Sequence, residues 1–352
     1  MTEEIPLASG HLGRCLHGKK AEDQKRMWRG ITSGLVRLHP DRWLYPSDYL
    51  RFANSIYNFK FRTDDVLVMT WPKCGTSWVQ EIIWTMKNNP NLDNPEQSTA
   101  ISMRVPFLDK FSIPVVICSF NPNSSLLPAR TRVLQSISQE CVRGKTPVTA
   151  TPKPRAIKTH LPFSLFGPSL IDTSKVIYMA RHPKDIVISY YHHVCLFKSM
   201  SYSGTFDQFF EAFINDDLVY GPYWLHLKEA WEKRDHDNLH FMLYEDLKAN
   251  PLRELRNLDT FLSTGLSADQ LEKICNYTHF DQMKQRNNLW EDIGIEDNVY
   301  NKDFAKEHGG FFRKGESNSW QSRLTPEQNQ KMDDWIAKNL TPLGIEFRGQ
   351  GV

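Results

Sequence analysis

The chain has 352 residues, of which 40% are hydrophobic and 24% charged, values typical of a globular protein. Its 43 lysines and arginines nearly balance its 41 aspartates and glutamates, so the overall charge points to neither a nucleic acid nor an acidic membrane surface as a partner. The six cysteines form no C-x-x-C pair, which argues against a zinc site and a dense disulfide framework. The acidic start and the lack of a long apolar run lead us to expect a cytoplasmic protein.

Four short apolar runs that end before a polar or glycine-containing turn are predicted to be strands, at residues 65–70, 155–159, 175–180 and 239–244. Helical patterns follow the first, third and fourth runs, at residues 77–87, 183–198 and 245–261. The repeated order of strand, turn and helix predicts an α/β fold, with one domain built around a central, mostly parallel sheet flanked by helices. In such sheets ligands bind at the carboxyl ends of the strands.

We expect this domain to span residues 41–352 and to follow a loosely ordered or peripheral arm at residues 1–40. Residues 88–154 are rich in Pro, Ser and Asn and are too many for a plain crossover between two strands. They are predicted to form an extended insert with some helices and a partial lid.

The turn after the first predicted strand reads WPKCGTSW, from Trp71 to Trp78, and carries groups that can bind an anion. Backbone N–H groups around Gly75, two hydroxyl side chains, the start of a helix and Lys73 together suit a phosphate. The pattern G-x-x-x-x-G-K-[ST] of nucleoside triphosphatases is absent, so a triphosphate-dependent kinase is the least favoured function. Taken alone, the segment fits equally well a plain turn whose hydroxyl group caps the helix.

Five short segments follow one another along most of the chain: TWPKCGTSW (70–78), KTHLP (158–162), YMARHPKDIVISYYH (178–192), LYEDL (243–247) and FRKG (312–315). Together they resemble the motifs of the cytosolic sulfotransferase family, and the extended insert resembles that of insect members. The resemblance implies a single α/β domain with a P-loop-like loop for the phosphosulfate group. It also implies 3′-phosphoadenosine 5′-phosphosulfate (PAPS) as the donor co-substrate, 3′-phosphoadenosine 5′-phosphate (PAP) as the product, a small-molecule acceptor and no metal.

The resemblance assigns two groups of residues to the phosphates of the donor and a third group to its base. The 5′ end would be held by Lys73, Cys74, Gly75, Thr76 and Ser77. The 3′-phosphate would be held by Arg181, Ser189, Arg313, Lys314 and Gly315. Arginine suits this task because its guanidinium group can contact two phosphate oxygens at once. The adenine would lie near Trp78, Tyr244, Thr278 and Phe280.

The resemblance also implies how the chemistry would run. His160 stands where the family has its general base, and the ordinary pKa of histidine suits proton transfer at neutral pH. Lys73 would neutralise charge on the leaving nucleotide, and Lys158 would assist. Ser189 would contact the catalytic lysine, as its counterpart does in the family.

The acceptor is expected to be a small and largely apolar phenol or alcohol that binds beside His160. We predict that residues 105–111 form part of a lid over it, and we assign Phe107 and His193 to the acceptor site. The apolar stretch at 101–120 fits a buried element of the core equally well, because short apolar runs cannot be told apart by pattern.

The chain departs from the family pattern near its C-terminus, where RKGESNSWQ (313–321) replaces R-K-G-x-x-G-D-W-K, so that Asn318 and Ser319 stand in place of Gly-Asp. The dimer motif of vertebrate members, K-x-x-x-T-V-x-x-x-E, is not recognisable, which leaves the oligomeric state open. Two alternatives to sulfate transfer remain. One is a PAPS-dependent dehydratase of an allylic alcohol that resembles insect retinol dehydratase, and the other is a non-catalytic PAPS-binding protein.

Overall fold

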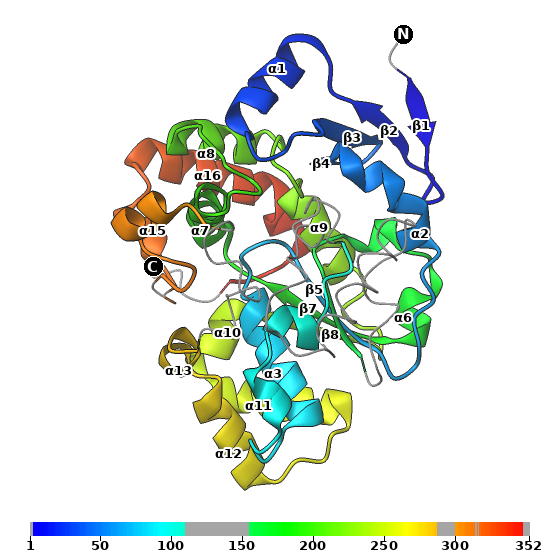
Figure 1. Ribbon diagram of the computed structural model, residues 1–352, viewed down its shortest axis with the longest axis vertical. Coiled ribbons are helices and arrows are strands. Elements are labelled where there is room, and N and C mark those ends of the chain that lie inside the picture. Colours follow the sequence, from blue (N-terminus) through cyan, green and yellow to red (C-terminus); the bar gives the residue numbers. More distant parts are fainter. Residues whose placement is uncertain (1–2, 110–154, 287–299, 314, 316, 348–352) are drawn as a thin grey trace, which may run out of the picture.

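The computed structural model describes residues 3–109, 155–286, 300–313, 315 and 317–347. A sheet of four strands lies at its centre (Figure 1), formed by β5 (Val66–Thr70), β6 (Ala156–Thr159), β7 (Lys175–Ala180) and β8 (Leu239–Leu243). The strand order is β6-β5-β7-β8, and every neighbouring pair is parallel. The strands coincide within one residue with the runs predicted from the sequence, so the predicted α/β fold is confirmed.

Helices cover both faces of this sheet, because its side chains point alternately to either side. Val66 and Val68 of β5 belong to one buried cluster, whereas Leu67 and Met69 belong to the other. The first cluster includes residues of α3 (Thr76–Asn88), α11 (Pro251–Leu262) and α12 (Ala268–Tyr277). The second includes residues of α7 (Pro183–Leu196), α8 (Phe206–Ile214), α9 (Tyr223–Trp231) and α16 (Pro326–Asn339).

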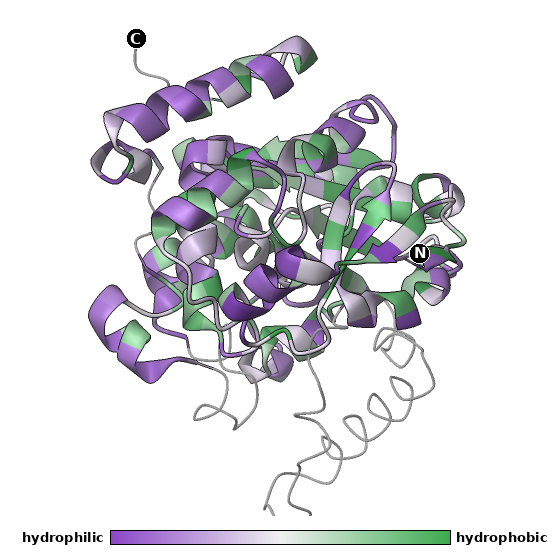
Figure 2. Ribbon diagram, turned by 90° about the horizontal axis from the view of Figure 1, so that it is seen from above, coloured by the Kyte–Doolittle hydropathy of each residue, from purple (hydrophilic) through white to green (hydrophobic). Residues whose placement is uncertain are grey.

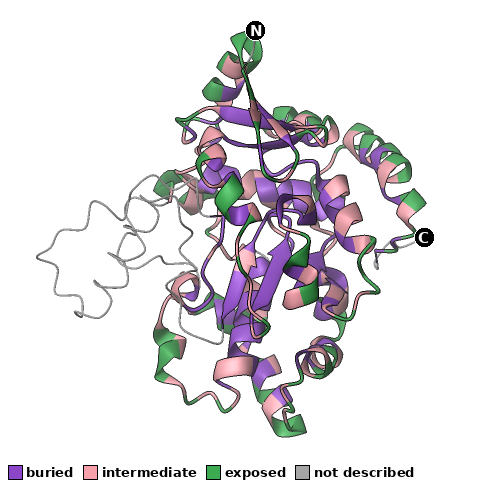
Figure 3. Cartoon of the chain, turned by 90° about the vertical axis from the view of Figure 1, so that its right-hand side faces the viewer, coloured by how far each residue is buried: buried purple, intermediate pink, exposed green. Residues whose placement is uncertain are grey.

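Hydrophobic residues accordingly gather in the interior and hydrophilic ones on the peripheral helices (Figure 2), and the central strands are largely buried (Figure 3). Shorter helices complete the described part of the chain: α1 (Gly18–Met27), α2 (Ala53–Tyr57), α4 (Ile101–Arg104), α6 (Ser169–Thr173), α13 (Phe280–Lys284) and α15 (Lys302–His308). None of the described helices combines the length and the apolar character that a membrane crossing requires.

The helix predicted at residues 245–261 is instead two helices, α10 (Tyr244–Ala249) and α11. Pro251 lacks the N–H group that would continue the helical hydrogen bonds, and it disfavours helical backbone angles at Asn250, where φ is −146° and ψ is 74°. The side chain of Asn250 caps α11 by accepting a hydrogen bond from the Arg253 N–H group. The break leaves Tyr244 at the carboxyl end of β8.

The loose order expected for residues 1–40 is wrong for the described residues of that segment. A second, antiparallel sheet is formed by β1 (Glu4–Pro6), β2 (Leu12–Cys15), β3 (Leu35–His39) and β4 (Trp43–Pro46). Val36 and Leu38 are fully buried and belong to the same cluster as α7. Within β4, the Leu44 carbonyl accepts a hydrogen bond from the Tyr220 N–H group at 2.8 Å, so this sheet is joined to the loop before α9.

Candidate active site

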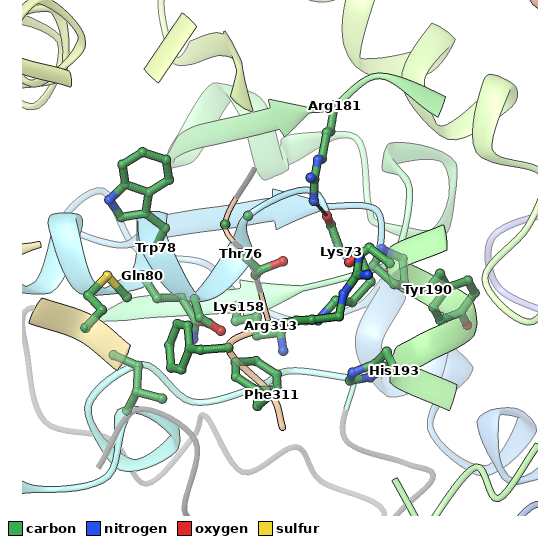
Figure 4. Close-up of a pocket in the computed structure, with 18 of the residues that line it drawn as sticks. Lys73, Thr76, Trp78, Gln80, Lys158, Arg181, Tyr190, His193, Phe311 and Arg313 are labelled. Carbon is green, nitrogen blue, oxygen red and sulfur yellow. Dashed lines mark hydrogen bonds between the residues drawn. The ribbon is translucent and has the colours of Figure 1, made fainter. Parts of the chain in front are cut away.

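A cavity of about 490 Å³ lies at the carboxyl ends of β5, β6 and β7, where the fold predicts a ligand. Its lining comes from the loop after β5, the end of β6, α7, the start of α10, residues 311–313 and residue 315 (Figure 4). Segments far apart in the sequence therefore meet in one site. As expected, the motifs that follow the strands lie together at the carboxyl edge of the sheet.

The loop between β5 and α3 wraps tightly because two of its residues have positive φ angles, 71° at Lys73 and 97° at Gly75. A Cβ atom at Gly75 would lie 2.8 Å from both Met179 Sδ and Tyr244 Cδ2, so only glycine fits there. Helix α3 begins at Thr76 with no acidic residue in its first turn. Its positive dipole end therefore faces the cavity without a side-chain anion to neutralise it.

The cavity gathers positive charge. Its described lining contains five lysine or arginine residues, namely Lys73, Lys158, Arg181, Lys248 and Arg313, whereas Asp109 is the only acidic residue in that lining. Burial, followed by the charges of Arg181, Lys158 and Arg313, lowers the pKa of Lys73 to about 7. Positive groups this close repel one another, so a bound anion with several charges would stabilise them.

His160 follows β6 and is buried beside these cations. Its Nδ1 atom lies 2.8 Å from the Thr70 carbonyl oxygen, which can only accept a hydrogen bond, so Nδ1 carries the proton and Nε2 is left with its lone pair. Burial, and next the charge of Lys158, hold the pKa of His160 well below its ordinary value. The imidazole is therefore neutral at physiological pH and able to accept a proton.

An apolar wall stands next to His160. The Phe107 ring lies 5.2 Å from the His160 ring, and the Tyr220 ring lies 5.6 Å away from it, both in edge-on contact. The Lys158 ammonium group lies 4.2 Å from the centre of the Phe107 ring. His193 of α7 also lines the cavity, and its ring contacts that of Phe197 at 4.3 Å between ring centres. Burial, and next the charge of Lys73, hold the pKa of His193 well below its ordinary value.

Aromatic rings surround the other end of the cavity. Trp78 and Tyr244 meet edge to face at 5.7 Å, and the Arg181 guanidinium group lies 4.2 Å from the centre of the Tyr244 ring. Gly315 has a φ of 63°, and a Cβ atom there would lie 2.4 Å from the Phe280 ring. The backbone at Gly315 therefore passes directly over Phe280, which only glycine permits.

Most of the predicted site residues line this one cavity: Lys73, Gly75, Thr76, Ser77, Trp78, Phe107, Lys158, His160, Arg181, Ser189, His193, Tyr244, Phe280, Arg313 and Gly315. Two do not line it. Cys74 is fully buried, which raises the pKa of its thiol, and Thr278 donates its hydroxyl hydrogen to the Ile274 carbonyl oxygen. Lys314 and residues 110–111 of the predicted lid lie outside the described residues.

The sequence did not point to several residues that shape the site. Thr70, Asp109 and Tyr220 contact His160 or line the cavity. Asp109 and Tyr220 lie in none of the five motifs, and Thr70 begins the first motif but was given no role. The only signal for Asp109 is its position two residues after Phe107. The unusual residues Asn318 and Ser319 are held by α7, because the Asn318 N–H group and the Ser319 hydroxyl group both donate to the Asp185 carboxylate.

No group of three His, Cys, Asp or Glu side chains that could hold a metal ion occurs among the described residues.

Comparisons with known proteins show the family to which the chain belongs. The family model of the sulfotransferase domain matches residues 63–344. Sulfotransferase 1A1 of Rattus norvegicus is 34% identical over 301 residues, which cover 84% of this chain and 92% of the rat protein. A crystal structure of retinol dehydratase in a complex with retinol and PAP has a TM-score of 0.80 and 28% sequence identity, and the similarity covers 97% of this chain and 100% of that chain. A structure of retinol dehydratase with androsterone and PAP has a TM-score of 0.77, 25% identity and coverage of 98% and 99%. With a family model that spans most of its length and a relative above 30% identity, the chain belongs to the sulfotransferase family.

Proposed function

We propose that the protein transfers the sulfuryl group of PAPS to a hydroxyl group of a small, largely apolar phenol or alcohol. The observation that carries the proposal is the cluster of Lys73, Lys158, Arg181 and Arg313 beside a neutral His160 in one cavity. Such a cluster is stabilised by a ligand with several negative charges, and a neutral histidine next to it can take a proton from an acceptor.

The chain's own residues fit a nucleotide with two phosphate groups. Lys73, the helix start at Thr76 and the hydroxyl group of Ser77 would hold the 5′ end, and Gly75 gives it room. The 3′-phosphate would be held by Arg181, Ser189, Arg313 and Gly315. The base would lie among Trp78, Tyr244 and Phe280. The presence of PAP in two similar structures supports this assignment. When bound, PAPS supplies an activated sulfuryl group.

His160 is the proposed general base. Because Nδ1 donates to the Thr70 carbonyl oxygen, Nε2 is the atom that would accept the proton of the acceptor hydroxyl group. Lys73 would hold positive charge where negative charge grows on the leaving side, and Lys158 would assist from β6. Ser189 lies one helical turn before His193 on α7, and its contact with Lys73 stays a prediction.

The acceptor would lie against Phe107, with His193 on the other side of the cavity. Apolar walls with few polar groups suit a small aromatic or isoprenoid alcohol. Of the predicted lid, residues 105–109 are described. Val105 and Leu108 are buried in the core, whereas Phe107 is half-buried and lines the cavity, so its contact with the acceptor stays a prediction.

The test uses PAPS with a panel of phenols and alcohols, and mass analysis of the products. A sulfate ester is the expected product. His160→Gln should lower kcat by about 10²-fold or more while PAP affinity stays near wild type, because the side chain takes part in proton transfer. His17→Gln, a histidine outside the cavity, serves as the matched control. Wild-type kcat in His160→Gln with several acceptors would contradict the assignment of the base.

A second candidate is dehydration of an allylic alcohol. It is favoured by the similarity to retinol dehydratase, which extends over nearly the whole of both chains. Here the product would be lighter than the alcohol by one water molecule, and inorganic sulfate would accumulate with PAP. The same mass analysis with allylic and saturated alcohols separates the two candidates, because a saturated alcohol can be sulfated yet does not readily eliminate. PAP binding without any product would instead indicate a non-catalytic binding protein.

A further inference from the structure

The backbone N–H and carbonyl groups of His160 are each held by a buried side chain that the proposed reaction does not use. Its N–H group lies 3.2 Å from each carboxylate oxygen of Asp109, which also accepts a hydrogen bond from the Thr159 hydroxyl group at 2.8 Å. Its carbonyl oxygen lies 3.2 Å from His226 Nε2. With the contact between Nδ1 and Thr70, the residue is fixed at three points.

The proton positions at His226 follow from its partners. The His160 carbonyl oxygen can only accept, so His226 Nε2 carries the hydrogen and donates it. Nδ1 then accepts from the Tyr178 hydroxyl group, 2.8 Å away. Burial lowers the pKa of His226 to about 3, so the ring is neutral at physiological pH and this arrangement persists there. Tyr178 thus selects the tautomer that holds the His160 carbonyl group.

Asp109 lies at the end of the segment that forms the acceptor wall. The Lys158 N–H group donates to the Pro106 carbonyl oxygen at 2.9 Å, and the Leu108 N–H group donates to the Lys158 carbonyl oxygen at 2.8 Å. Residues 106–108 therefore pair with β6 just before His160. This pairing brings Phe107 against the His160 ring and the Asp109 carboxylate against the His160 N–H group.

We propose that Asp109 and His226 are positioning residues for the general base. They fix the backbone of His160 so that its Nε2 atom keeps its orientation toward the acceptor. The inference rests on the proposed role of His160 as the base. A buried carboxylate is an expensive way to satisfy one peptide N–H group, and burial raises the pKa of Asp109 to about 7. Such a cost is common at functional sites, where a side chain must be held in one geometry.

Asp109→Asn is the variant that tests the carboxylate. It keeps the shape of the side chain, but either orientation of the amide turns an NH₂ group toward the His160 N–H group, since both oxygens lie at equal distance from it. We expect the single-turnover rate to fall about 10- to 100-fold. PAP affinity and the acceptor KM should stay within about twofold of wild type, because no phosphate contact is changed.

Tyr178→Phe tests the hydrogen bond from His226 to the His160 carbonyl oxygen. Without the hydroxyl donor, His226 can place its hydrogen on Nδ1 and turn a lone pair toward the His160 carbonyl oxygen. We expect a smaller fall in the single-turnover rate, about 5- to 10-fold. Phe107→Ala is the matched comparison for Asp109→Asn, because it lies on the same segment and should raise the acceptor KM instead.

The final arm repeats Asp109→Asn in a His160→Gln background. A residue that acts through His160 should cost little once that histidine is gone, so the two effects should not add. A further fall in that background, or an unchanged rate in Asp109→Asn with intact His160, would overturn the inference. If Asp109→Asn does not fold, a wild-type rate in Tyr178→Phe overturns it and a reduced rate supports it. If His160→Gln itself keeps the wild-type rate, the failure lies with the proposed base.

Discussion

PAP binding at pH 8 should be accompanied by the uptake of a proton by Lys73. In the free protein burial lowers the pKa of this lysine to about 7 from an ordinary value of 10.5. At pH 8 about 0.9 of the Lys73 side chains are therefore neutral, and a bound anion that restores the ordinary pKa would draw in about 0.9 proton per site. At pH 6 the same calculation gives about 0.1 proton.

The linkage also sets the pH dependence of binding. A ligand whose binding takes up one proton loses up to about tenfold in affinity for each pH unit above the pKa of the free group. PAP affinity should therefore fall as the pH rises from about 7 towards 10.5. Just below pH 7, where Lys73 is already protonated in the free protein, the affinity should be nearly constant as long as the phosphate groups of PAP are ionised. Raising the pH thus weakens binding, although the charge on PAP does not change.

Titration calorimetry at pH 8 in buffers of different ionisation enthalpy measures the uptake directly. Lys73→Arg keeps the positive charge but does not titrate in this range, so its uptake should be close to zero. Lys228→Met, which removes a lysine of α9 outside the cavity, is the control and should behave as wild type. No uptake in the wild type, or equal uptake in Lys73→Arg, would refute the argument.

Three further outcomes follow from the geometry. Gly75→Ala should weaken PAP binding by about tenfold or more, because the added Cβ atom would lie too close to Met179 and Tyr244. Gly344→Ala, also at positive φ but in open space, should leave PAP binding unchanged, and calorimetry measures both affinities. Phe107→Ala should change the ranking of acceptors by KM and spare thermal stability, and a variant that unfolds would place Phe107 in the core. Asp65→Ala should lower the free energy of unfolding in urea by about 3–5 kcal/mol, since it removes the buried carboxylate that pairs with the Arg155 guanidinium group, and a loss below 1 kcal/mol would contradict this.

The sheet and the donor side of the cavity could be predicted from the sequence because their signals are local. Each strand is a short apolar run, and the motifs that carry Lys73, His160 and Arg181 each follow a strand directly, so the parallel order alone brings these three residues to one edge. The helix break at Pro251 was missed although its signal is equally local, because the apolar pattern continues across it.

The acceptor side could not be predicted in the same way. The contact between Asp109 and His160 joins residues 51 positions apart, and that between Thr70 and His160 spans 90 positions. Neither follows from a pattern within one segment. The N-terminal sheet was missed because its strands have three to five residues and because β3 carries Arg37, which is buried through an ion pair with Asp217, 180 positions away.

The hydrogen bonds between Leu44 and the loop at Tyr220 have a consequence for how such a protein can diversify. Leu44 lies before residue 63, where the match to the family model begins, yet its backbone holds the loop whose tyrosine faces the proposed base. Changes in the first sixty residues can therefore shift one wall of the acceptor cavity by small steps. The lysines and arginines proposed to bind the nucleotide lie on other segments and would be undisturbed. Selection for new acceptors could thus act on a part of the chain that carries none of the proposed nucleotide contacts.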